Sequence, residues 1–278
     1  MPIPAIPLRS GSTPVTIPQL GFGVWQVADD EAAVAVAEAL RVGYRHVDTA
    51  RLYDNEEGTG RAVRESGIPR EEVFVTSKLW PSDFTRDAAH ASFEGTMARL
   101  GLDVLDLFLL HWPAPGRGQY VEAWRALLEL RDSGRVRAVG VSNFTDEHLQ
   151  RLADETGELP CLNQVELHPY LQQTALRAFH GANGIVTEAW SPLASGKRVL
   201  EDPVVGRIAV KHDVTPAQAI IGWHLTLGNV VIPKSVTPSR IAENFAAADV
   251  RLDEADLADF AGLDQGFRTG PDPDHFEG

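Results

Sequence analysis

The residues best suited to chemistry stand at the ends of apolar runs in the sequence. Asp48, Lys78 and His111 each end or follow such a run, and Tyr53 comes in the loop after Asp48. Carboxylate, phenol, ammonium and imidazole groups are the ones that transfer protons in enzymes. Further runs lead to polar or aromatic residues: Ser142, Asn143, Gln164, Trp190, Ser191, Lys234 and Ser235. A full series of such residues predicts one shared site.

Each of these residues also has a structural explanation when taken alone. Asp48 could cap a turn, and Tyr53 could be half-buried with its hydroxyl in solvent. A lysine after a strand, such as Lys78, is usually a surface residue. We assign His168 and Cys161 to the core. The His and Cys spacings match no known metal-ligand pattern, so we expect no metal.

The apolar runs predict about eight strands that alternate with helical patterns. The expected strands are 20–25, 45–48, 73–76, 105–110, 136–141, 162–165, 185–188 and 230–232. Strict alternation is typical of parallel β/α units, and runs that are apolar throughout indicate strands buried on both faces. No low-complexity linker divides residues 1–278. We predict a single α/β domain, a (β/α)₈ TIM barrel, with a doubly wound sheet as the alternative.

Two local patterns refine this prediction. The turn signal Ser10-Gly11-Ser12 lies between the runs 6–8 and 15–17, so we expect a short N-terminal hairpin. Gly21-Phe22-Gly23 has the first two glycines of the dinucleotide fingerprint, but Gln26 replaces the third. A dinucleotide on a Rossmann-type turn is therefore not supported, whereas the carboxyl ends of barrel strands are the usual place for chemistry.

The composition excludes several classes of protein. Among 278 residues, 25 are Lys or Arg and 39 are Asp or Glu, so the net charge of −14 argues against broad nucleic-acid binding. No apolar run reaches the roughly 18 residues of a membrane span, and the N-terminus lacks a secretory pattern. Cys161 is the only cysteine, which excludes an internal disulfide. We therefore expect a cytoplasmic protein.

Several motifs, in order along the chain, resemble those of the aldo-keto reductases. They are 43–50 (GYRHVDTA) followed by Tyr53, Asn55 and Glu56, then 77–80 (SKLW), 110–113 (LHWP), 140–144 (GVSNF), 163–166 (NQVE) and 232–235 (IPKS). The resemblance spans residues 18–244 and is strongest to bacterial 2,5-diketo-D-gluconate reductases and related small aldehyde reductases. It implies a barrel whose bottom is closed by the hairpin, and NADPH-dependent reduction of aldehydes or ketones to alcohols.

The resemblance assigns a catalytic tetrad to Asp48, Tyr53, Lys78 and His111, with Tyr53 as the general acid and His111 orienting the carbonyl. A free phenol has a pKa of about 10. A Lys78 ammonium about 4 Å away would favour the tyrosinate by up to about 4 kcal/mol at an effective dielectric of about 20. We therefore expect the pKa of Tyr53 to fall near physiological pH, with Asp48 keeping Lys78 charged.

The resemblance also implies the binding residues. Those expected to hold NADPH are Gly23, Ser142, Asn143, Gln164, Trp190, Ser191, Leu193, Lys234, Ser235, Val236, Arg240, Glu243 and Asn244. Thr237 and Pro238 predict a helix N-terminus there, which suits the adenosine 2′-phosphate. Trp25, Trp80 and Trp112 are expected to line an apolar substrate mouth above His111. The tail 267–278 is expected to fold over this mouth.

Alternatives to a carbonyl reductase remain open at this point. A barrel of this kind could bind NADPH as a sensor with little turnover. Lys78 could form a Schiff base, although that chemistry requires a neutral amine and Asp48 favours the charged form. The physiological direction could be alcohol oxidation. The substrate is not specified by the sequence beyond a small carbonyl compound, and we expect a monomer.

Overall fold

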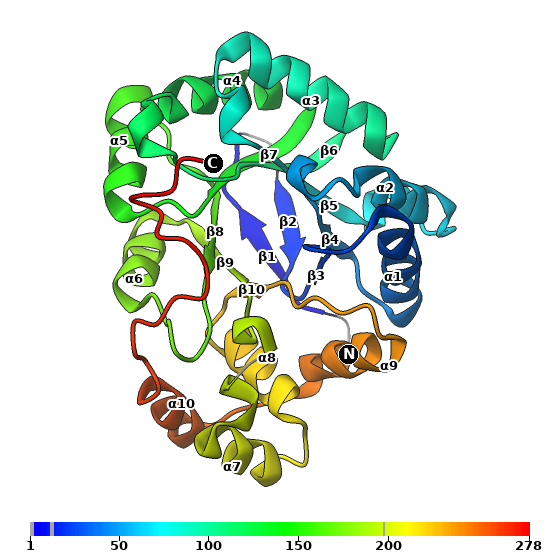
Figure 1. The fold of residues 1–278 in the computed structure, drawn as a ribbon, viewed down its shortest axis with the longest axis vertical. Coiled ribbons are helices and arrows are strands. Elements are labelled where there is room, and N and C mark those ends of the chain that lie inside the picture. Colours follow the sequence, from blue (N-terminus) through cyan, green and yellow to red (C-terminus); the bar gives the residue numbers. More distant parts are fainter. Residues whose placement is uncertain (1–2, 12–13, 197) are drawn as a thin grey trace.

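Eight parallel strands form the centre of the molecule, in a computed structural model that describes residues 3–11, 14–196 and 198–278 (Figure 1). Each strand pairs with the next along the chain. A parallel bridge between Leu20 and Val231 joins the first edge to the last. This closure confirms the predicted barrel and rejects the doubly wound sheet. The strands are β3 (Phe22–Gly23), β4 (His46–Asp48), β5 (Phe74–Leu79), β6 (Leu105–Leu110), β7 (Val136–Ser142), β8 (Leu162–Glu166), β9 (Val186–Trp190) and β10 (Val230–Val231).

Two strands differ from the prediction in ways that matter for the site. Only Phe22–Gly23 of the run 20–25 is a regular strand, and a Cβ on Gly21 would lie 2.4 Å from the His46 imidazole. β5 continues past 76 because it keeps pairing with β6, Lys78 opposite Leu109 and Leu79 opposite Leu110. Lys78 is therefore part of the strand and is fully buried.

The N-terminal hairpin closes one end of the barrel. β1 (Ala5–Leu8) pairs antiparallel with β2 (Val15–Pro18), as predicted, while Ser12 of the expected turn lies outside the described residues. Leu8 and Val15 are buried in one cluster with Leu107 and Leu162 from the barrel strands. Apolar burial of this kind contributes about 1.5–3 kcal/mol per large side chain. The opposite end of the barrel is left for the site.

Helices surround the strands (Figure 1). They begin and end where local signals predict: three acids open the first helix and Gly43, at φ 129°, follows its end. Their bounds are α1 (Asp29–Val42), α2 (Glu56–Glu65), α3 (Arg86–Leu100), α4 (Tyr120–Asp132), α5 (Asp146–Thr156), α6 (Thr174–Asn183), α7 (Pro203–Lys211), α8 (Pro216–Thr226), α9 (Pro238–Ala246) and α10 (Glu254–Ala261). Within the described ranges, none of them is long and apolar enough to cross a membrane.

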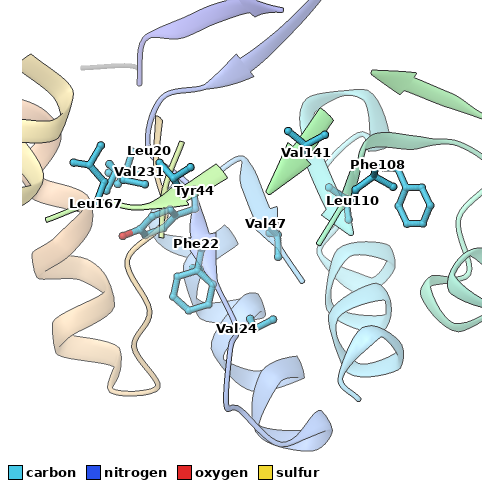
Figure 2. Close-up of a cluster of buried hydrophobic side chains, with 14 of the residues drawn as sticks. Leu20, Phe22, Val24, Tyr44, Val47, Phe108, Leu110, Val141, Leu167 and Val231 are labelled. Carbon is cyan, nitrogen blue, oxygen red and sulfur yellow. The ribbon is translucent and has the colours of Figure 1, made fainter. Parts of the chain in front are cut away.

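Strand alternation separates the apolar core from the polar barrel interior. Val47 and Val141 belong to the main hydrophobic cluster with Leu110 (Figure 2). Because successive side chains of a strand point to opposite faces, His46 and Asp48 on either side of Val47 share the other face. That face is the inside of the barrel, where the site is built.

Candidate active site

A cavity of about 450 Å³ lies at the carboxyl ends of the strands. Tyr53, His111 and Asp48 contribute to its floor, and Lys78 lies directly beneath. The cavity contains these residues of the predicted tetrad together with part of the predicted cofactor and substrate sets. Its lining residues are Gly23, Trp25, Gln26, Asp48, Leu52, Tyr53, Trp80, His111, Trp112, Ser142, Asn143, Gln164, Trp190, Ser191, Pro192, Ser195, Ile232, Lys234, Thr269, Gly270, Pro271 and Phe276.

The four predicted catalytic residues form one hydrogen-bonded chain. The Lys78 Nζ donates to Asp48 Oδ1 over 2.6 Å and to the Thr49 carbonyl over 3.0 Å. The same nitrogen lies 3.2 Å from the Tyr53 hydroxyl. That hydroxyl is 3.4 Å from His111 Nε2. The structure therefore brings the four side chains together.

Neighbouring elements fix each member of the chain. Asp48 ends β4 opposite Thr76 of β5, and Lys78, two residues beyond Thr76, points to the same face of the sheet as Asp48. Tyr53 closes a short 3₁₀ turn, Arg51–Tyr53. The Asn55 amide holds the loop after this turn by donating to two backbone carbonyls, each over 2.9 Å. His111 follows β6, and its N–H donates to the Leu79 carbonyl.

Burial reverses the expected shift of the Tyr53 pKa. The Lys78 charge does favour the phenolate, but removing the hydroxyl from water costs more, and Asp48 opposes the lysine. The net effect raises the pKa of Tyr53 to about 12. The prediction of a phenol titrating near neutrality was wrong, because it counted the ammonium and not the dry surroundings. Tyr53 is a protonated phenol at neutral pH, which is the form a proton donor needs.

Lys78 and His111 are held in defined charge states. Burial disfavours the Lys78 ammonium, but the Asp48 carboxylate and the Tyr53 oxygen outweigh it and raise the pKa of Lys78. Burial and the Lys78 charge together hold the pKa of His111 well below its usual value. The site therefore presents a cationic lysine beside a neutral imidazole.

Amide and indole groups form the wall beside this floor. Asn143 donates to the His111 carbonyl and to Ser142 Oγ, each over 3.0 Å. Its side-chain oxygen accepts the Trp190 indole N–H over 2.8 Å. The Gln164 Nε2 donates to Asp48 Oδ2 over 2.8 Å and to Glu188 Oε2 over 2.9 Å. Both amide hydrogens of Gln164 are thus committed to carboxyl groups, which leaves its oxygen for the cavity.

The structure divides the predicted cofactor residues into two groups. Seven line the cavity: Gly23, Ser142, Asn143, Gln164, Trp190, Ser191 and Lys234. Six do not: Leu193, Ser235, Val236, Arg240, Glu243 and Asn244. Most of the second group lie on α9 or just before it. The predicted helix start is confirmed, although the Thr237 hydroxyl does not cap it and Ser235 Oγ instead accepts the Thr237 N–H.

The three predicted indoles line the mouth, and the tail completes it. Trp25 is 47% exposed, whereas Trp112 is buried at 7%. The Phe276 ring lies 4.5 Å from Trp112 and 6.0 Å from Trp80, measured between ring centroids. In Figure 1 the red C-terminal segment runs from α10 past α6 to this end of the barrel. The expectation that the tail folds over the mouth is confirmed.

A buried carboxylate anchors this tail. Glu166 accepts the backbone N–H of Thr269 over 2.6 Å and that of Gly270 over 3.1 Å. His168, predicted to be a core residue, is buried and lies 3.1 Å from Glu166. The Gly270 backbone lies close to the Trp190 indole: a Cβ at this position would lie 2.5 Å from the ring. Glycine at 270 therefore lets the tail close on the cavity wall.

Sequence reasoning missed two kinds of residue. The tail 267–278 was expected over the mouth, but Thr269, Gly270, Pro271 and Phe276 were not singled out within it, because they carry no local signal that would place them in the cavity lining. Glu188 is different, since a glutamate inside a strand predicted to be buried on both faces is itself a signal. It is fully buried below the floor of the cavity.

Comparison with known proteins places this geometry in a family. The model of the aldo/keto reductase family matches residues 19–265. The chain belongs to the aldo/keto reductase family. An aldo-keto reductase of Mycolicibacterium smegmatis is 52% identical over 98% of both chains. The methylglyoxal reductase DkgA of Escherichia coli K12 is 50% identical over 98% of both. A crystal structure of a Gox0644 mutant in complex with NADPH superposes with a TM-score of 0.93, at 47% identity over 99% of each chain.

Membership of the aldo/keto reductases fixes the class of reaction. The protein is an NADP-dependent oxidoreductase that reduces carbonyl groups to alcohols. The fold predicted from the motifs and the TIM barrel of these relatives agree. The roles of individual residues in this aldo/keto reductase follow from its own geometry.

Proposed function

We propose that Tyr53 is the proton donor of this reductase and that His111 orients the substrate carbonyl. One observation carries the proposal: the Tyr53 hydroxyl and His111 Nε2 lie 3.4 Å apart on the cavity floor. A carbonyl oxygen between them can accept a hydrogen bond from both. The Lys78 Nζ donates to the Tyr53 oxygen over 3.2 Å and stabilises the phenolate left after proton transfer.

The cavity wall fits the dinucleotide of this family. Trp190 offers a flat indole face, and Gln164 offers an amide oxygen that can accept the carboxamide N–H₂. Lys234 adds a cation on the same side. Gly23 lets two backbone segments approach closely at this wall, since a Cβ there would lie 3.2 Å from the Ile232 carbonyl oxygen. Bound NADPH supplies the hydride that reduces the carbonyl carbon.

The remaining cofactor residues extend from this wall toward α9. Ser191 and Leu193 would hold the pyrophosphate, and Lys234, Ser235 and Arg240 the 2′-phosphate. Val236 would border the same segment, while Glu243 and Asn244 would reach the adenine. The start of α9 supports this assignment because a helix N-terminus attracts phosphate.

We propose small neutral aldehydes of the methylglyoxal class as substrates. The mouth is apolar, formed by Trp25, Trp80, Trp112 and Phe276. Among the described residues that line the cavity, Asp48 and Lys234 alone are of the Asp, Glu, Lys and Arg types, and Asp48 is paired with Lys78. Relatives at 50% identity are named methylglyoxal reductases.

The alternative roles of the site are less well supported. Schiff-base formation needs a neutral Lys78, whereas its Asp48 partner keeps the amine protonated. A sensor would not need a buried proton donor and a lysine to support it. The direction of the reaction depends on the ratio of oxidised to reduced cofactor.

The further assignments concern the whole chain. We propose one domain over residues 1–278 because all eight parallel strands belong to one sheet. We also propose a monomer in the cytoplasm that does not bind nucleic acid. The net charge of −14 supports the last point, and the lone, buried Cys161 supports a reducing compartment.

Tyr53→Phe tests the assignment directly. We expect turnover of methylglyoxal with NADPH to fall by about 10²–10⁴-fold, because the donated proton is lost while the ring stays. NADPH affinity, measured by calorimetry, should stay within about twofold of wild type. Undiminished turnover in Tyr53→Phe would refute the assignment. Binding of NADPH by the wild type without turnover on any aldehyde or ketone would favour the sensor.

A further inference from the structure

The barrel interior contains a buried carboxyl group, Glu188, that has no role in the proton and hydride transfer proposed above. Glu188 projects from β9 opposite Gln164 of β8 and is 0% exposed. Its Oε2 accepts one amide hydrogen of Gln164, and Asp48 Oδ2 accepts the other. The amide therefore links the tetrad to Glu188.

Two carboxyl groups on one amide cannot both be ionised cheaply in a dry interior. Among the described residues, Lys78 is the cation beside these two carboxyl groups, and its Nζ is paired with Asp48 Oδ1 at 2.6 Å. Asp48 is thus the ionised partner, and Glu188 is left without a cation of its own. Like charges sharing a site push one proton back onto the pair. That proton belongs on Glu188.

We propose that Glu188 is a positioning residue of this reaction: as a neutral carboxylic acid it accepts one amide hydrogen of Gln164 and so directs the Gln164 oxygen toward the nicotinamide side of the cavity. The proton sits on Oε1, because Oε2 accepts the amide. His46 Nε2 lies 3.6 Å from Oε1. The inference rests on the proposed function of the site.

The groups that face Glu188 from each neighbouring element agree with this charge state. On β4, Asp48 is ionised, and burial lowers the pKa of His46 to about 3, so the imidazole is neutral. On β5, Lys78 is charged. Just before β8, burial raises the pKa of the Cys161 thiol to about 12, so it is uncharged. Burial and the Asp48 charge raise the pKa of Glu188 to about 8.

A dependence on pH follows, with a definite sign. Below about pH 8 the neutral acid is present, and above it Glu188 becomes an anion. The new negative charge raises the pKa of Tyr53 further, because it stabilises the protonated phenol. A weaker acid donates its proton more slowly. The rate of hydride transfer should therefore fall by about threefold between about pH 7 and pH 9.

The first experiment compares Glu188→Gln with wild type across this pH range. In Glu188→Gln, the single-turnover rate of methylglyoxal reduction should no longer fall between about pH 7 and pH 9, because a neutral amide cannot ionise. Glu56→Gln is the matched control, since Glu56 is equally buried but bonds Arg99 and Ser77 outside the barrel interior. It should keep the fall. An identical fall in Glu188→Gln and wild type would overturn the proposal.

A second comparison tests the positioning role through binding. Glu188→Met removes the acceptor at nearly the same volume, so NADPH should bind about fivefold more weakly, the equivalent of one lost hydrogen bond. Glu188→Gln, which restores an acceptor, should recover most of this affinity. Equal NADPH affinity in Glu188→Met and wild type would refute the positioning role.

An infrared titration needs neither turnover nor substitution. Protein carrying ¹³C-carboxyl glutamate should show a protonated-carboxyl band at pH 7 that disappears above about pH 8. Absence of that band at pH 7 overturns the inference. Because this reading is independent of Tyr53, failure of the proposed function and failure of the Glu188 proposal can be told apart.

Discussion

At the scale of single residues, Trp190 combines two roles that are usually separate. Its ring lines the cavity, and its indole N–H donates a hydrogen bond to the Asn143 side-chain oxygen over 2.8 Å. The Asn143 amide nitrogen is already bonded to Ser142 and to the His111 backbone. The indole therefore fixes the orientation of the Asn143 side chain, which bonds the His111 backbone.

Trp190→Phe separates the two roles. The flat face is kept, but the Asn143 oxygen loses its donor, so we expect NADPH to bind about fivefold more weakly, equivalent to about 1 kcal/mol. Trp190→Ala should weaken binding further, since the face is lost as well. Calorimetric titration with NADPH measures both. Trp112→Phe is the control, because the Trp112 ring lies 6.5 Å from Trp190 and does not bond Asn143. Equal losses of NADPH affinity in Trp190→Phe and Trp112→Phe would contradict the argument.

The sequence was sufficient to predict the tetrad but not its electrostatics. Asp48, Lys78 and His111 were identifiable because each ends or follows an apolar run within a specific motif, and Tyr53 because it stands in the loop after Asp48 in such a motif. The pKa of Tyr53 was predicted in the wrong direction, since the cost of removing a phenol from water depends on packing that no local pattern encodes. Glu188 was overlooked although a glutamate in a buried strand is a signal, and its pairing with Gln164 exists only in the folded sheet.

At the scale of elements, helix α2 shows how glycine serves packing. A Cβ added at Gly60 would lie 2.1 Å from the Leu100 carbonyl oxygen at the end of α3. A Cβ added at Gly58 would lie 2.1 Å from the Asp29 carbonyl oxygen at the start of α1. Glycine inside a helix costs about 1 kcal/mol relative to alanine. The close approach of three helices outweighs that cost here.

Gly60→Ala tests this balance. Although alanine is the better helix former, we expect the variant to lose at least about 2 kcal/mol of unfolding free energy, because backbone must move to admit the methyl group. Gly206→Ala in α7 is the matched control: open space surrounds that position, so stability should rise by about 0.5–1 kcal/mol. Urea unfolding of both variants gives the answer, and a stabilised Gly60→Ala would disprove the packing argument.

Element order was predictable, while element ends were less so. Alternating apolar runs and helical patterns are local, and they led to the barrel. The run 20–25 contains only a two-residue strand, and the Gly21 and Gly23 N–H groups donate to the Val231 and Pro233 carbonyls where the barrel closes. Closure joins the two edges of the sheet through Leu20 and Val231, which are about 210 residues apart in the sequence. No window of sequence contains that information.

At the scale of the whole molecule, one buried carboxylate ties the last helix to the barrel layer. Asp256 of α10 accepts Lys211 Nζ over 2.8 Å and His212 Nε2 over 2.7 Å from the end of α7. Burial alone would raise the pKa of Asp256, but these donors and the Asp253 N–H outweigh it and lower the pKa to about 2. The tail that covers the mouth departs from this helix.

Acid should release this connection. Because the folded-state pKa is depressed, the stabilisation is present above the unfolded value of about 4 and is lost as pH falls toward about 2. Asp256→Asn should cost about 2 kcal/mol at pH 7, a difference that disappears near pH 2. Thermal unfolding against pH measures it. Asp259→Asn, from a more exposed pair with Arg207, should cost less than about 0.5 kcal/mol at any pH.

The clustering of indoles around one cavity has an optical consequence. Four of the six tryptophans, Trp25, Trp80, Trp112 and Trp190, line the space where a reduced nicotinamide would bind, while Trp124 and Trp223 are buried elsewhere. Indole emission overlaps the near-ultraviolet absorption of reduced nicotinamide, so excitation energy passes from these rings to the bound cofactor. The intrinsic fluorescence of the chain should therefore fall when the reduced cofactor binds, which reports its occupancy without any label.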